Sequence, residues 1–275
     1  MRAKQYRAFG HMRYFHSRTE QPKPQNFERH CHDTYEILYV IHGFGKYVVE
    51  GAEYSLKPNT LLFTRPYEFH YVCPDLDGLY ERCVIHFDLS APIDSAARLS
   101  LLSREGGAGY GMYFAEEALG EEIRAIFAEI GASFEMFEGA SQRAEYEETM
   151  FRTALTRLLF FLSAEKPKAM LPEEETLAMR VTDYINRNLS SPLSLDALAG
   201  HFFVSKYYLC HAFRRQAGVS VSAYINTKRI AVAEQMLASG EPATAVAFAV
   251  GFGNYSTFYR AFCKRTGHPP AHRRE

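Results

Sequence analysis

Long apolar runs are missing from this sequence of 275 residues. No stretch reaches the length that a helix needs to cross a bilayer, which speaks against a transmembrane protein. The initial segment MRAKQYRAFGHMRYF has a charged or polar residue every few positions, and this pattern does not fit a signal peptide. We therefore expect a soluble, cytoplasmic protein that has no membrane partner.

Paired cysteines and the common catalytic motifs are also absent. The five cysteines, at positions 31, 73, 83, 210 and 263, are odd in number and form no C-x-x-C pair. Neither a disulfide framework nor a thiolate zinc site is therefore expected. The sequence has no Gly-rich phosphate loop, nucleotide fingerprint or Ser/His/Asp pattern. We expect a protein that is not an enzyme, with no catalytic residue and no cofactor.

Charge is present but unevenly distributed. The whole chain has a net charge of −1, yet residues 176–275 contain 12 Lys/Arg and 5 Asp/Glu, a balance of +7. Residues 1–175 hold the other 19 basic and 27 acidic side chains, a balance of −8. A basic module attracts the phosphate backbone of nucleic acids, although a solvated basic face without a partner is the commoner explanation.

Short β-branched and aromatic runs dominate residues 35–88. The runs EILYVIHG, GKYVVEG, EYSLKPN, TLLFTRP and ERCVIHFD are separated by glycines, prolines and an EGAE turn, which predicts a small barrel or sandwich. Residues 91–118 are rich in Ser, Gly and Ala and predict no clear element. Two helices are predicted over 121–137 and 142–162.

The second of these predicted helices has a stripe of side chains at spacings of three and four. Its members are Tyr146, Met150, Ala154, Arg157, Leu158 and Phe161. Such a stripe fits packing inside the subunit or a dimer seam equally well. The segment SAEKPKAMLPEEE that follows is typical of a linker. The predicted units are a sensing barrel (1–118), a helical packing or dimerisation segment (119–166), a linker (167–175) and a DNA-binding domain (176–275).

The last hundred residues contain two copies of one pattern, offset by 48 or 49 positions. The first copy contains Ala199, Leu209, Phe213 and Gly218, and the second contains Ala247, Phe258, Phe262 and Gly267. Ser205 and Asn254, four residues before Leu209 and Phe258, are good helix caps, and a glycine ends each copy. Each copy therefore predicts a helix-turn-helix unit, at about 194–215 and 243–265.

A single helix is expected to join the two units. The segment VSAYINTKRIAVAEQMLASG has no interior Gly or Pro, and about 18 helical residues span roughly 27 Å, close to the spacing of successive major grooves. A solenoid array is the structural alternative, but arrays need roughly three or more repeats. Basic residues also gather on the second helix of each copy, which favours binding to double-stranded DNA.

The region 194–274 resembles the DNA-binding domain of the AraC/XylS family of transcription regulators, above all in the fragment AFAVGFGNYSTFYRAFCKRTG. The resemblance implies that the second helix of each unit enters the major groove. The side chains expected to contact DNA are Ser205, Lys206, Tyr207, Cys210, His211, Arg214, Arg215, Asn254, Tyr255, Ser256, Thr257, Arg260 and Lys264.

Histidines in the first half resemble the metal motifs of the cupin barrel. His30, His32 and Glu36 have H-x-H-x3-E spacing, and His70 follows in P-Y-E-F-H. Three imidazoles and a carboxylate suit Fe, Mn, Ni or Zn. We favour the alternative that these residues line a ligand pocket or form hydrogen bonds within the barrel.

The same half resembles the arabinose-binding-type sensor of AraC regulators, which implies a small polar effector, with a sugar or oligosaccharide as the first guess. The candidate ligand-binding residues are His30, His32, Tyr35, Glu36, Tyr39, Tyr47, Arg65 and His70. The predicted fold is an α+β multidomain protein, with a cupin-like barrel followed by an all-α double helix-turn-helix domain. The expected function is that of a homodimeric transcription activator that works with RNA polymerase.

Two other functional classes are compatible with the sequence. A metal-dependent cupin enzyme fused to a DNA-binding module is the first, and it predicts a tightly held metal. A scaffold protein without salt-dependent binding to duplex DNA is the second.

Overall fold

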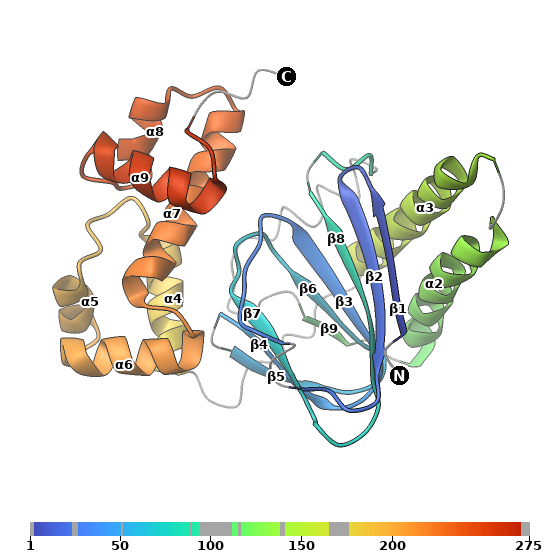
Figure 1. Cartoon of the computed structure of the whole chain (residues 1–275). Coiled ribbons are helices and arrows are strands. Elements are labelled where there is room, and N and C mark those ends of the chain that lie inside the picture. The colour runs from blue at the N-terminus through green and yellow to red at the C-terminus, as the bar shows by residue number, and fades with distance from the viewer. Residues whose placement is uncertain are drawn as a thin grey trace.

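The computed structural model describes residues 3–23, 27–50, 52–88, 90–93, 112–114, 117–137, 141–164 and 176–270. A β-rich domain is followed by two long helices and then by a separate helical domain (Figure 1). The two long helices and the helical domain lie on opposite sides of the β-rich domain. Within the described part of the chain, no helix has both the length and the apolar character needed to cross a membrane.

The β-rich domain consists of two facing sheets. The larger has the order β1-β2-β8-β3-β6-β9, and the smaller has the order β5-β4-β7, with antiparallel neighbours throughout. The strands are β1 (Ala3–Phe9), β2 (Met12–Thr19), β3 (Tyr35–His42), β4 (Gly45–Val49), β5 (Ala52–Leu56), β6 (Thr60–Thr64), β7 (His70–Pro74), β8 (Tyr80–Phe87) and β9 (Met112–Phe114).

Strand β3 shows how the two faces of the large sheet differ. Its even-numbered side chains, such as Leu38 and Val40, belong to the core between the two sheets. Its odd-numbered side chains, such as Ile37 and Tyr39, belong to a second core on the outer face. Both faces are covered, so most of this strand is apolar instead of alternating between apolar and polar residues.

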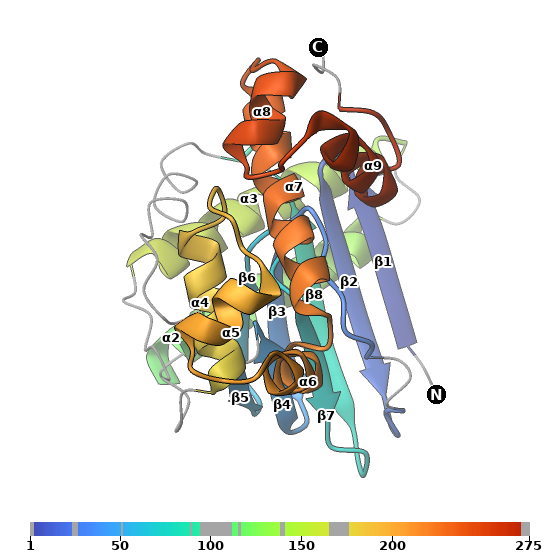
Figure 2. The same ribbon diagram turned by 90° about the vertical axis from the view of Figure 1, so that its left-hand side faces the viewer.

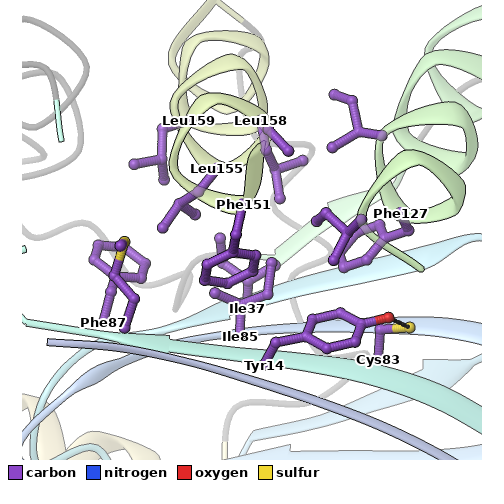
Figure 3. Close-up of a cluster of buried hydrophobic side chains, with 14 of the residues drawn as sticks. Tyr14, Ile37, Cys83, Ile85, Phe87, Phe127, Phe151, Leu155, Leu158 and Leu159 are labelled. Carbon is purple, nitrogen blue, oxygen red and sulfur yellow. Dashed lines mark hydrogen bonds between the residues drawn. The ribbon is translucent and has the colours of Figure 1, made fainter. Parts of the chain in front are cut away.

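The outer face of the large sheet is covered by α2 (Glu117–Met136) and α3 (Arg143–Ala164). Phe151, Leu155 and Leu158 of α3 are fully buried and point at the sheet (Figure 3). Facing them from the sheet are Tyr14 and Ile85, together with other large apolar side chains. This packing confirms the two predicted helices to within a few residues.

Only part of the stripe predicted on the second helix lies on the buried face of α3. Ala154 and Leu158 lie in the core, whereas Tyr146 and Met150 are about 40% exposed. The buried face runs instead through Phe151, Leu155, Leu159 and Leu162, because these side chains meet the sheet. Packing inside the subunit therefore explains one side of α3, and a dimer seam on the other side stays a prediction.

Sequence patterns did not reveal the hairpin of β1 and β2. These strands are joined at Gly10 and His11, where Gly10 has φ +52°, and β2 pairs with β8 along its whole length. Strand β9 likewise falls in the region 91–118, for which no element was predicted; most of that region lies outside the described residues.

The helical domain contains two helix-turn-helix units joined by one long helix. The first unit is α5 (Leu195–His201) and α6 (Lys206–Ala217), preceded by α4 (Leu177–Arg187). The joining helix is α7 (Val221–Ala238), and the second unit is α8 (Ala243–Ala249) and α9 (Tyr255–Thr266). The predicted repeat and the predicted joining helix are confirmed.

The predicted caps fix both ends of α6 and α9. The side chains of Ser205 and Asn254 accept hydrogen bonds from the backbone N–H of Tyr208 and Thr257. Gly218 and Gly267 end the helices in the left-handed conformation, each with φ +78°. Equivalent caps place the two helices in equivalent positions within their units.

Candidate DNA-binding surface and barrel cavity

Helices α6 and α9 carry most of the predicted DNA-contacting side chains in exposed positions. The exposed ones are Ser205, Lys206, Tyr207, His211, Arg214, Arg215, Asn254, Ser256, Thr257, Arg260 and Lys264. Cys210 and Tyr255 are half-buried. The apolar sides of the two helices pack into their own units through Phe213 and Phe258, so their polar sides are left to face a partner.

Helix α7 sets the separation of the two units. It contains 18 residues, which corresponds to a length of about 27 Å. Its first half packs on the first unit through Tyr224, and its second half packs on the second unit through Ile230 and Leu237. One continuous helix therefore packs on both units and connects them.

The β-rich domain contacts the helical domain beside α7 (Figure 2). Glu50, in the turn between β4 and β5, is fully buried and lies 3.0 Å from Nζ of Lys228. The hydroxyl of Tyr224 also donates to this carboxylate, and the ring of Tyr224 lies 5.7 Å from that of Phe69. Farther along α7, the hydroxyl of Tyr67 donates to Glu234. The β-rich domain thus contacts α7 and also the last turns of α6 and α9, where Arg29 meets the carbonyl of Arg215 and Cys31 meets Arg265. The predicted DNA-contacting side chains of α6 and α9 stay exposed apart from Cys210 and Tyr255.

A cavity of ≈500 Å³ opens in the β-rich domain. Its walls come from the inward faces of β2, β7 and β8 and from the segment that precedes β3. The lining residues are Tyr6, Arg13, Phe15, Phe27, Glu28, Arg29, His30, Glu36, His70, Tyr71, Val72, Arg82, Val84 and His86. The volume and the mixture of aromatic and charged walls suit a small polar ligand.

The predicted ligand-binding residues are only partly brought together by this cavity. His30, Glu36 and His70 line it. Tyr35 and Tyr39 lie on the opposite face of β3, where Tyr35 stacks on Phe87 and Tyr39 on Phe127.

Three further predicted residues do not line this cavity. Tyr47 is buried, with its hydroxyl 2.5 Å from Oγ1 of Thr64. The backbone N–H of Arg65 donates to Glu68. His32 contacts Glu36 and also borders a second cavity, at the domain boundary.

Several residues that line this cavity were not predicted from the sequence. Arg13 of β2 and Arg82 and His86 of β8 point inward because alternate residues of a strand share a face. The run ERCVIHFD contains the spacing that puts side chains on one face of a strand, since Arg82, Val84 and His86 are two residues apart. Which face turned inward depends on pairing with β2 and β3, which the run itself does not contain.

A histidine cluster surrounds the buried carboxylate of Glu36. Nε2 of His86, His32 and His70 lies 2.8, 3.2 and 3.5 Å from Oε2 of Glu36. Burial by itself would raise the pKa of Glu36, but the contacts with these imidazoles outweigh burial and hold the pKa well below its usual range. The rings of His30 and His70 are 4.5 Å apart, so His30 completes the cluster.

The donor set of this cluster fits a divalent metal. One potential ligand atom each from His30, His32, Glu36 and His70 lies within 4.8 Å of the others. Nδ1 of the three histidines lies 2.7, 2.9 and 2.7 Å from the backbone carbonyls of Glu28, Thr34 and Glu68. A carbonyl only accepts, so Nδ1 of each ring carries a proton, and Nε2 is left as the nitrogen that could ligate an ion. Nε2 of His70 has no hydrogen-bond partner among the described residues.

Comparisons with known proteins agree with both parts of this arrangement. Residues 16–154 match the model of an AraC-like ligand binding domain, and residues 198–275 match that of a helix-turn-helix domain. The HTH-type transcriptional activator RhaS of Escherichia coli (strain SMS-3-5 / SECEC) is 25% identical over 249 residues, which are 86% of this chain and 84% of RhaS.

The uncharacterized HTH-type transcriptional regulator YbfI of Bacillus subtilis (strain 168) is 26% identical over 235 residues, 84% of this chain and 81% of YbfI. Among solved structures, ToxT from Vibrio cholerae O395 aligns over 95% of this chain and 96% of its own, with 14% identity and a TM-score of 0.36. The superposition on ToxT does not pair individual residues of the two chains. The two matched domains together show that the chain belongs to the AraC family of DNA-binding transcription regulators.

Proposed function

We propose that this regulator binds two successive major grooves with α6 and α9, and that a small polar ligand in the barrel cavity changes the contact between the barrel and α7. One observation carries the proposal: the barrel contacts α7 through the buried Glu50–Lys228 pair while the polar faces of α6 and α9 stay exposed. A ligand that favours one arrangement of the two domains shifts its population.

The chemistry of the two exposed faces supports DNA reading. Arg260 offers a guanidinium that can donate two hydrogen bonds to guanine, and Thr257 offers a methyl group that can contact thymine. Ser205 and Asn254 lie at helix N-termini, where the free backbone N–H groups favour phosphate. Lys206 forms an ion pair with Asp196 at 2.6 Å, so its amine is positioned at the start of α6.

The cavity is the proposed effector site. Phe15, Phe27 and Tyr71 supply aromatic walls, and Arg13, Arg82 and Glu28 supply charged groups for hydrogen bonds to a polar ligand. Aromatic faces next to hydrogen-bonding side chains suit a sugar or an oligosaccharide, which is the first class of effector to test.

Dimer formation through α2 and α3 is part of the same proposal. Met136, Tyr146 and Met150 are 70%, 41% and 40% exposed, on the side of these helices that faces away from the sheet. A second copy that covers these side chains would bury apolar surface left in solvent by the monomer. Two copies would place four DNA-reading helices on one DNA site. Contact of this dimer with RNA polymerase would make the regulator an activator. The relative RhaS is named a transcriptional activator.

The experiment is a binding titration of the full chain on DNA from upstream of its neighbouring genes, with and without candidate sugars. We expect one fragment to bind in preference to the others and one sugar to change that affinity at least tenfold. The variant Arg82→Met, in the cavity, should abolish the effect of the sugar and leave ligand-free DNA binding intact. Arg13→Met tests a second cavity arginine in the same way. Equal affinity for all fragments would contradict DNA reading, and an affinity that no sugar changes would contradict a sugar effector.

A further inference from the structure

The segment from Arg29 to Asp33 lies between the histidine cluster and the helical domain. Its even-numbered residues, His30 and His32, turn toward Glu36. Its odd-numbered residues, Arg29 and Cys31, contact the helical domain. An extended chain places alternate side chains on opposite sides. This short segment therefore contacts the histidine cluster on one side and the helical domain on the other.

Arg29 and Cys31 contact the last turns of α6 and α9, respectively. The guanidinium of Arg29 donates to the backbone carbonyl of Arg215, at 3.3 Å and 3.4 Å from its two terminal nitrogens. Nη2 of Arg265 donates to Sγ and to the carbonyl oxygen of Cys31, at 2.9 and 3.4 Å. The last carbonyls of a helix lack partners within the helix, so a donor from outside stabilises the end of α6.

The other side of the segment is tied to the cluster. Reciprocal backbone hydrogen bonds of 3.1 and 2.9 Å join His30 to His70 at the start of β7. The backbone carbonyl of His32 accepts from the N–H of Tyr67 at 2.7 Å. A change in the position of His30 or His32 is therefore passed directly to Arg29 and Cys31, which are bonded to them in the chain.

The potential ligand atoms of the cluster already face one another. With Nδ1 bonded to a carbonyl, Nε2 of His32 and Nε2 of His70 turn toward the carboxylate of Glu36, at 3.2 and 3.5 Å, so the nitrogens that can ligate an ion converge on the oxygen that can ligate it. Ligands held 2.0–2.2 Å from one ion lie at most about 4.3 Å apart, so the widest pair in this set, at 4.8 Å, has to close by only about 0.5 Å. Binding an ion would thus require only a small movement of the segment.

We propose that His30, His32, Glu36 and His70 bind a divalent transition-metal ion, and that this ion fixes segment 29–33 against the ends of α6 and α9. The ion makes the chain a metal-responsive regulator whose docked arrangement is stabilised when metal is bound. Imidazole nitrogens and one carboxylate select Zn²⁺, Ni²⁺, Fe²⁺ or Mn²⁺ over Mg²⁺ and Ca²⁺. Metal binding stands independently of the proposed DNA reading, whereas its regulatory meaning rests on that function.

The first measurement is a Co²⁺ titration of the chelator-treated full chain, followed by visible absorption and by Zn²⁺ competition. We expect one Co²⁺ per chain. The variant His30→Gln changes an exposed ring and should fold normally, yet it should weaken binding about tenfold or more, since even a lost partner of a ligand costs 10–100-fold. His16→Gln is the matched control, because His16 contacts Glu81 outside the cluster at 2.9 Å.

Amide hydrogen exchange of the full chain tests the effect on the helices. Zn²⁺ should slow exchange severalfold in residues 29–33 and in the last turns of α6 and α9 of the native chain and of His16→Gln. It should leave His30→Gln unchanged. No saturable Co²⁺ binding, or equal binding by His30→Gln, overturns the metal site. Stoichiometric binding with unchanged exchange in the helix ends overturns the link to the helical domain. Neither result depends on DNA, so failure of the proposed function is detected separately.

Discussion

Nζ of Lys228 in α7 lies 3.0 Å from Oε1 of Glu50, in the turn of the β-rich domain between β4 and β5. The carboxylate is fully buried, and the same oxygen accepts from the backbone N–H of Phe69 at 2.8 Å. Glu50 also has φ +52°, a conformation that costs a residue other than glycine free energy. The structure therefore holds a charged pair and a strained residue at the contact between the two domains.

Replacing Lys228 should loosen this contact. Lys228→Met keeps the length of the side chain but leaves the Glu50 carboxylate buried without its cation, a change that costs about 3 kcal/mol or more. Amide hydrogen exchange should accelerate in the β4–β5 turn and in the first half of α7. Lys46→Met is the control, since the pair of Lys46 and Glu53 is exposed and solvent screens it. Equal exchange in the two variants would contradict a role of the Glu50–Lys228 pair in docking.

Gly251, in the turn of the second helix-turn-helix, should not tolerate a side chain. It has φ +93°, and a Cβ atom there would lie 2.5 Å from the carbonyl oxygen of Leu189. Gly251→Ala should destabilise the helical domain by about 1–3 kcal/mol. Gly253→Ala, two residues later, meets no atom within 4 Å and serves as the control. Thermal unfolding of both variants measures the difference, and identical midpoints would contradict this account of the turn.

The exposed side of α3 should determine the oligomeric state. Met150→Glu places a charge on the proposed dimer surface without entering the core, so the variant should sediment as a monomer and keep the native unfolding temperature within a few degrees. Ala197→Glu, on α5 of the helical domain, is exposed, lies on the other side of the β-rich domain from α2 and α3, and should leave the dimer intact. A native chain that sediments as a monomer at every concentration would show that α2 and α3 do not form the proposed interface.

The helical domain was largely predictable from sequence because its signals are local. The caps Ser205 and Asn254 and the terminal glycines Gly218 and Gly267 act within a few residues of the chain, and each lies where the pattern predicted it. The apolar pairs that close each unit are also near neighbours in the sequence.

The cavity was less predictable because it depends on long-range pairing. Strand β3 is buried on both faces, so the run EILYVIHG did not show that Glu36 faces the cavity while Tyr35 and Tyr39 face the helices. Placing His86 beside Glu36 requires the pairing of β3 with β8, fifty positions away. The contact of Glu50 with Tyr224 spans 174 positions, and no local pattern encodes it.

Sequence-specific reading of DNA by α6 and α9 is the central claim, and Arg260→Ala tests it most directly. Affinity of the full chain should be measured across a salt series on the preferred upstream fragment and on a scrambled fragment, with Arg187→Ala on α4 as the control. We expect affinity to fall steeply with salt, and Arg260→Ala to lose about 1–3 kcal/mol on the preferred fragment while binding the scrambled one almost as before. Equal losses on both fragments, or affinity that salt does not change, would contradict the claim.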